Sequence, residues 1–184
     1  MAISQAALEQ RVRRLEDRLE IRELAGRYGF AVDDRNIGNL ERLFTPDAAF
    51  RSKDGVMNAH GRTAVIEQFR GRFSVLGLSN HFTHDHLIEL SDDPDHATGI
   101  VSSHAEVWRN GQALLGALRY EDMYQRHQGR WCFADRLLSF LYYMPVGEYA
   151  EDLGSLLRMR AYGDRRPADF PESLPSWREY HGEG

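Results

Sequence analysis

Three histidines and an aspartate lie close together in the segment 80–86, which reads NHFTHDH. Imidazole and carboxylate groups bind metal ions, and they also transfer protons in catalysis. The order His-x-x-His-Asp-His differs from the metal-binding His-x-His-x-Asp-His pattern, and no cysteine or further cluster completes a set of ligands. As part of a β-strand, His84 and His86 would share one face, with His81 and Asp85 on the other. We therefore expect no metal at this segment.

The second alternative is a histidine that acts as a general base, with a carboxylate to orient it. Such a carboxylate fixes the tautomer of the ring and stabilises the imidazolium that forms. Asp33 follows the apolar segment 29–32, where a buried carboxylate would need a cation or a donor as partner. A simpler interpretation is that Asp33 or Asp34 ends a helix and Asn36 caps the next one. The residues alone leave both interpretations open.

The composition excludes several classes of protein. The 184 residues fit one domain with a substantial core, and a net charge of −5 with almost no lysine disfavours a nucleic-acid partner. Cys132 is the only cysteine, so a disulfide framework is absent. The N-terminus is highly charged and no apolar run is long enough to cross a bilayer, so we expect a cytoplasmic protein without a membrane partner.

The elements that must position Asp33 and the histidines follow from the apolar periodicity. Residues 5–32 have apolar side chains three or four apart, which predicts one long helix with its first turns on the surface and its last turns in the core. A short helix follows, and Pro46 and Asp47 predict a turn before a strand at 48–52. The segment 53–55 predicts a hairpin turn to a strand at 56–60, and 61–73 a further helix.

From His84 onward the period changes to that of strands. Four strand-like runs are separated by turn signals at 92–95, Asn110-Gly111 and Gln128-Gly129, which predicts an α+β fold with a sheet that curls around a helix. The last strands are apolar on both faces, so we expect helices on one face and a neighbouring subunit on the other. A short helix from Glu148 and a proline-containing tail complete the chain.

Several phrases of the sequence resemble the SnoaL-like branch of the nuclear transport factor 2-like superfamily. These are IRELAGRYGFAVDDRNIGNLERLFTPDAAF, NHFTHDHLIEL and GRWCFADRLLSFLYY. Asp33 ends the "AVD" phrase of the first helix, and His81 comes eight residues before Glu89. Arg136 lies five residues after the tryptophan of a Trp-x-Phe phrase, and Tyr28 lies five residues before Asp33. Each of these four positions matches a catalytic position of the branch, which includes scytalone dehydratase, bile acid 7α-dehydratase and gamma-hexachlorocyclohexane dehydrochlorinase.

The resemblance implies a cone-shaped α+β barrel, with a curved mixed or antiparallel sheet around the long N-terminal helix. It assigns 1–146 to this domain and leaves 147–184 as a helix and tail, at an oligomer interface or wrapped around the domain. It implies a cofactor-independent lyase with His81 as base, Asp33 as its orienting partner, and Arg136 and Tyr28 as electrophilic helpers. Dehydration of an apolar aromatic or polycyclic small molecule is the leading reaction. Loss of formaldehyde from a diaryl alcohol, loss of halide and isomerisation are alternatives, and a homotrimer or homodimer is the expected assembly.

A rival interpretation is a non-enzymatic binding or assembly module, whose pocket would be closed or whose Asp33 and His81 would be separated. Further aromatic and histidine side chains are candidates to contact a ring-shaped substrate, although core packing explains each one singly. They are Phe30, Phe82, His104, Trp108, Tyr120, Phe140 and Tyr142.

Overall fold

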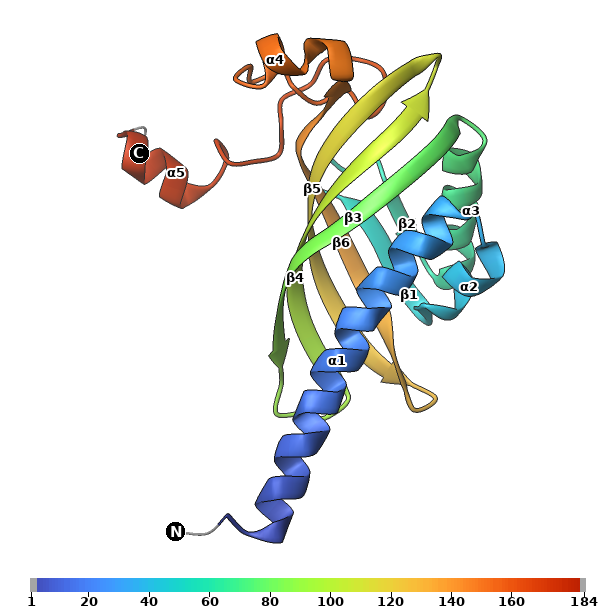
Figure 1. The fold of residues 1–184 in the computed structure, drawn as a ribbon, viewed down its shortest axis with the longest axis vertical. Coiled ribbons are helices and arrows are strands. Elements are labelled where there is room, and N and C mark those ends of the chain that lie inside the picture. Colours follow the sequence, from blue (N-terminus) through green and yellow to red (C-terminus); the bar gives the residue numbers. More distant parts are fainter. Residues whose placement is uncertain (1–2, 183–184) are drawn as a thin grey trace.

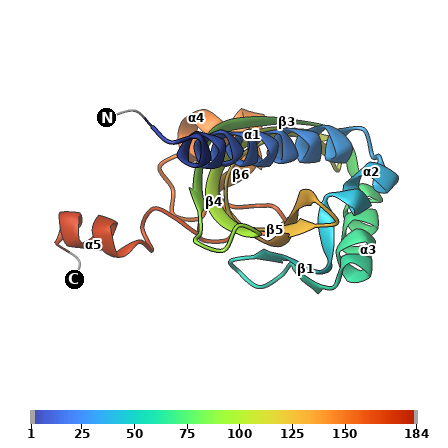
Figure 2. The same ribbon diagram turned by 90° about the horizontal axis from the view of Figure 1, so that it is seen from below.

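A curved sheet bends around one long helix without closing into a barrel, in a computed structural model that describes residues 3–182 (Figures 1 and 2). The helices are α1 (Gln5–Asp33), α2 (Ile37–Arg42), α3 (Arg62–Phe73), the 3-10 turn η1 (Val146–Glu148), α4 (Tyr149–Asp152) and α5 (Pro175–His181). The strands are β1 (Phe44–Ser52), β2 (Asn58–His60), β3 (Leu76–Leu90), β4 (His96–Arg109), β5 (Gln112–His127) and β6 (Arg130–Pro145). The predicted α+β fold class is confirmed.

The long helix α1 divides into an exposed half and a buried half. Ser4 caps its start, because the side-chain oxygen accepts a hydrogen bond from the Ala7 N–H at 3.2 Å. The first turns extend past the sheet in Figure 1, and their apolar side chains are exposed. From Ile21 onward the helix is buried against the inner face of the sheet, as its apolar spacing predicts. The buried half ends at Asp33.

The sheet has the strand order β2-β1-β6-β5-β4-β3. All neighbouring strands are antiparallel except β1 and β6, which are parallel, so the sheet is mixed. The turns predicted at 110–111 and 128–129 are confirmed: Asn110 and Gly111 have φ of 51° and 76°, and Gln128 and Gly129 have the same two values. Positive φ at both central residues matches the twist of the flanking strands. β3, which carries His81, is an edge strand of the sheet.

Three local predictions were wrong. Pro46 lies inside β1, which starts earlier than predicted and shifts its register between Phe44 and Ala49. A second irregularity lies in β3 between Thr83 and His86, so His84 and His86 do not share a face. The helix predicted from Glu148 shortens to η1 and α4, because the chain then turns back toward the sheet.

The segment after α4 lies beside β6 where β1 has ended. The Tyr143 N–H donates to the Arg158 carbonyl at 3.0 Å, and the Arg160 N–H donates to the Tyr143 carbonyl at 2.7 Å. Met159 and Phe170 are buried by this contact. In contrast, α5 has no buried residue and lies apart from the sheet in Figure 1. No helix within residues 3–182 has the length and apolar character needed to cross a membrane.

Candidate active site

Asp33 and His81 form a direct contact where the end of α1 meets the edge strand β3. Asp33 Oδ1 lies 2.6 Å from His81 Nδ1, and Asp33 Oδ2 accepts the backbone N–H of His81 at 2.7 Å. An edge strand leaves N–H groups without a partner strand, and here the carboxylate takes one of them. The Ser79 hydroxyl donates to Asp33 Oδ1 at 2.8 Å. The predicted meeting of His81 and Asp33 is confirmed.

These contacts favour the ionised form of Asp33 and orient the ring of His81. Burial raises the pKa of Asp33, but the hydrogen bonds from His81 and Ser79 outweigh it, and the net pKa lies below the ordinary value. An ionised carboxylate can only accept hydrogen bonds, so Nδ1 of His81 carries a proton. In the neutral ring Nε2 then holds the lone pair, and this nitrogen has no hydrogen-bond partner within residues 3–182. A histidine in this tautomer can remove a proton from a ligand.

Arg35 supports the pair from outside. Its Nη1 donates to the Val32 carbonyl at 2.7 Å and to the Ser79 hydroxyl at 2.9 Å, and its Nη2 donates to the Gly77 carbonyl. Arg35 therefore ties the end of α1 to β3. Sequence reasoning missed Arg35 and Ser79, although each is two residues from a member of the pair and Ser79 shares its strand face with His81.

His81 and Ser79 line a narrow hollow between α1, α3 and the inner face of the sheet. The free space inside the hollow is small, about 50 Å³, so a ligand the size of a ring needs the walls to move apart. Most of its walls are apolar or aromatic, and Tyr28, Tyr120 and Phe140 belong to them. These three are the predicted aromatic residues that the structure brings to the hollow.

The other predicted contact residues lie elsewhere. Phe30 is 73% exposed, since two residues along a helix from Tyr28 is the opposite side of α1. The remaining four each follow or precede an inward-facing neighbour in a strand, so they face outward. They are Phe82 beside His81, His104 beside Ala105, Trp108 beside Val107 and Tyr142 beside Tyr143. A substrate in this hollow would not contact these five side chains.

Arg136 lies behind the hollow, fully buried. Its Nε and Nη2 donate to the two oxygens of Asp122 at 2.9 and 3.0 Å. Its guanidinium carbon is 4.2 Å from the ring centre of Tyr28 and 4.0 Å from that of Tyr120. Burial raises the pKa of Tyr28, with Tyr120 adding to it and the Arg136 charge acting against it. Tyr28 therefore stays protonated and can donate a hydrogen bond.

A chain of polar contacts continues from Arg136 to the far side of the core. The Tyr124 hydroxyl donates to Asp122 Oδ2 at 2.8 Å and lies 2.9 Å from Nε2 of His86. Burial and the charge of Arg136 lower the pKa of His86 to about 4. His86 is therefore neutral at pH 7 and is a part of the core rather than of the hollow.

Comparison with known proteins places this geometry in a family. A family model described as a SnoaL-like domain matches residues 13–136. An uncharacterized protein of Mycobacterium tuberculosis is 31% identical over 128 residues, which cover 65% of this chain and 82% of that protein. A solved structure of a hexachlorocyclohexane dehydrochlorinase has a TM-score of 0.68 at 22% identity, over 73% of this chain and 92% of that one. A scytalone dehydratase-like protein of Novosphingobium aromaticivorans has a TM-score of 0.67 at 18% identity, over 72% and 89%.

The long helix inside an open, curved sheet is the cone of the nuclear transport factor 2-like fold. Within that fold class, the chain belongs to the SnoaL-like domain family, because the family model covers more than half of it. The resemblance of the sequence to this family is confirmed by the family model and by the shared fold.

Proposed function

We propose that this protein is a cofactor-independent lyase in which His81 is the general base. The observation that supports this most is the 2.6 Å contact between His81 Nδ1 and Asp33 Oδ1, which leaves Nε2 available at the wall of a hollow. Because the pair is intact and His81 lines an apolar hollow, an enzyme is favoured over a binding module.

In this scheme Nε2 of His81 takes a proton from a C–H bond of the substrate. The electron pair of that bond forms the new double bond, and the bond to the leaving group breaks with its electrons. A leaving hydroxyl needs a proton, which the Tyr28 hydroxyl can donate, whereas a leaving halide needs none. Arg136, behind the ring of Tyr28, would stabilise the phenolate that results.

The apolar walls favour a ring-shaped small molecule, as in the enzymes named among the structural neighbours. Dehydration is the leading reaction. Dehydrochlorination uses the same base without the proton from Tyr28. In loss of formaldehyde from a diaryl alcohol, the base would take a hydroxyl proton and a carbon–carbon bond would break. Isomerisation would return the proton to another carbon of the substrate.

The test is a screen of hydroxylated and halogenated ring compounds with the wild type, His81→Ala and Asp33→Asn, followed by mass spectrometry of the products. Loss of activity of about 10²–10⁴-fold is expected for both variants, the range for a missing base or its orienting partner. His84→Ala is the matched control, because His84 contacts His104 on the outer face of the sheet. Full activity in His81→Ala would refute the assignment.

We also propose that the outer face of the sheet is covered by further copies of the chain, as a trimer or dimer. This face carries large apolar side chains that are exposed in the single chain. They include Leu78, Phe82, Leu87, Ile100, Trp108 and Met123. Light scattering tests the assembly, and a monomer at micromolar concentration would contradict it. A cytoplasmic location stays a prediction.

A further inference from the structure

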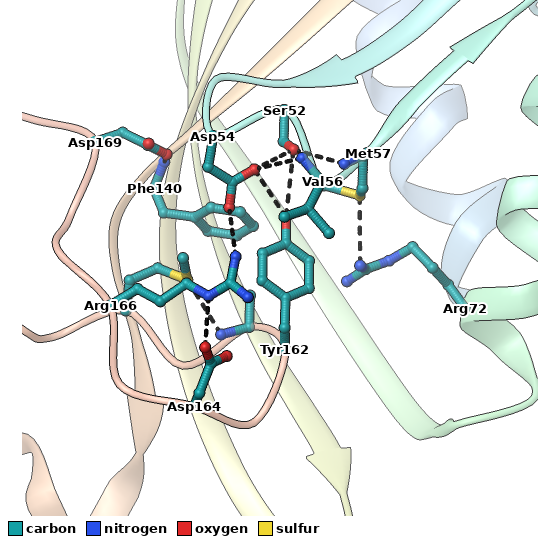
Figure 3. A network of polar contacts seen from close by, with 12 residues as sticks. Ser52, Asp54, Val56, Met57, Arg72, Phe140, Tyr162, Asp164, Arg166 and Asp169 are labelled. Carbon is teal, nitrogen blue, oxygen red and sulfur yellow. Dashed lines mark hydrogen bonds and ion pairs between the residues drawn. The ribbon is translucent and has the colours of Figure 1, made fainter.

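Arg72 brings a positive charge to the hollow that the protein itself does not neutralise. It belongs to the last turn of α3, is half-buried, and lines the same hollow as His81. Within residues 3–182 its one polar contact is from Nη1 to the Met57 sulfur at 3.4 Å (Figure 3). A thioether is a weak acceptor, and a guanidinium has five N–H donors. No carboxylate in that range forms an ion pair with Arg72.

Asp54, a carboxylate drawn together with Arg72 in Figure 3, is engaged by other groups. It accepts hydrogen bonds from the Ser52 hydroxyl and, at 3.1 Å, from the Val56 N–H. The Tyr162 hydroxyl lies 3.3 Å away and Arg166 lies 3.8 Å away. Figure 3 shows Asp54 turned toward these partners, whereas Arg72 reaches from α3 toward Met57. The charge of Arg72 is therefore left for a ligand or for water.

A second hydrogen-bond donor at the hollow, the hydroxyl of Tyr143, also lacks a partner in the described residues. The Tyr143 hydroxyl is buried and has no hydrogen-bond partner within residues 3–182, and its ring lines the hollow. Burial raises the pKa of Tyr143, and the charges of Arg72 and Arg109 act against this. Arg72 acts in the same direction on Tyr28 and Tyr120, where burial again raises the pKa. The charge of Arg72 therefore acts on side chains that line the hollow. The buried Tyr143 hydroxyl, which has no partner within residues 3–182, favours a ligand that can accept its hydrogen bond.

From this geometry we propose that Arg72, with Tyr143, binds a carboxylate of the substrate, so that the ligands of the hollow are ring-shaped carboxylic acids. A planar guanidinium matches a carboxylate with two parallel hydrogen bonds. One arginine balances the single charge of a carboxylate, whereas a phosphate carries more charge than this site offers. The proposal rests on the proposed function, because it names the substrates on which His81 acts. The apolar walls hold the ring, and Arg72 holds the acid group.

The test uses benzoate and naphthoate as probes, each with its neutral carboxamide, and measures dissociation constants by calorimetry. For the wild type the acids should bind more tightly than the amides. Arg72→Gln should weaken binding of the acids by about ten-fold or more, which is the loss of a charge-assisted bidentate contact. Binding of the amides should stay unchanged, and this also shows that the variant is folded. Arg70→Gln is the matched control, since Arg70 is exposed on α3 and pairs with Glu67 at 3.4 Å.

Two results would overturn the proposal: equal affinity of acid and amide in the wild type, or equal weakening of both by Arg72→Gln. Tyr143→Phe should weaken the acids by a smaller factor than Arg72→Gln, and a stronger effect on the amides would remove Tyr143 from the site. His81→Ala separates the two proposals. It should keep the preference for acids over amides while it loses turnover. Turnover that survives in His81→Ala would refute the lyase proposal and leave the acid site standing.

Discussion

Replacing Asp122 by asparagine should destabilise the fold by about 3 kcal/mol, because it leaves the Arg136 charge buried without a counter-charge. The side chains of Asp122 and Arg136 are 0% and 1% exposed, so water cannot solvate either group. The asparagine amide would turn a donor toward Arg136 and the Tyr124 hydroxyl, both of which are donors to Asp122. A broken buried pair costs about 3–5 kcal/mol, and the aromatic rings around Arg136 offset part of this loss.

Urea unfolding at pH 7, followed by circular dichroism, measures the change in the free energy of unfolding. For a chain of this size, 3 kcal/mol corresponds to a fall of roughly 6–12 °C in Tm. Asp135→Asn is the matched control, because Asp135 pairs with the partly exposed Arg51 and should contribute about 1 kcal/mol or less. Replacing both buried partners, as Asp122→Leu with Arg136→Met, should restore most of the loss. Equal effects of Asp122→Asn and Asp135→Asn would refute the reasoning.

Three further substitutions probe other parts of the structure. Gly99→Ala would place a Cβ 2.7 Å from the Leu87 carbonyl and 3.0 Å from the Tyr124 ring, so urea unfolding should show a loss of about 1–3 kcal/mol, and no loss would contradict this packing. Burial lowers the pKa of His86 from 6.5 to about 4, so the unfolded chain binds the proton first and stability falls as the pH drops from 6.5 toward 4. His86→Gln should flatten stability against pH in that window, and an unchanged slope would assign the acid sensitivity to other groups. Arg158→Met removes hydrogen bonds to Leu141, Ser155, Phe170 and Glu172, so hydrogen exchange should accelerate in 155–172 while β4 and β5 stay protected.

The first three helices and the hairpins of the meander could be predicted from the sequence because their signals are local. Asn110-Gly111 and Gln128-Gly129 set the turns of the meander, and apolar residues three or four apart set the long helix. The irregularity between Thr83 and His86 has no such signal, since it depends on how β3 pairs with β4. It turns His86 toward the core and leaves His84 on the outer face, whereas the sequence predicted both on the same face.

Within the site, His81 and Asp33 could be predicted from their resemblance to a family, but their surroundings required the fold. Once His81 faces inward, strand alternation requires Phe82 to face outward. The prediction that Phe82 contacts the substrate could therefore have been avoided. Arg72 offered no comparable signal. Its importance depends on the absence of a carboxylate partner anywhere in residues 3–182, which no spacing within α3 reveals.

The buried carboxylate of Asp122 and the partly buried carboxylate of Asp33 differ in what they contribute. Asp122 compensates a buried charge, so its loss affects stability. Asp33 belongs to the last turn of α1, where the helix dipole disfavours a negative charge, and it is held by donors from His81 and Ser79. Asp33→Asn would relieve that unfavourable interaction while it loses charge-assisted hydrogen bonds, so the two effects on stability oppose each other. The same Asp-to-Asn exchange should therefore mainly destabilise the fold at Asp122 and mainly reduce turnover at Asp33, as expected when a chain retains a locally unfavourable carboxylate for its chemistry.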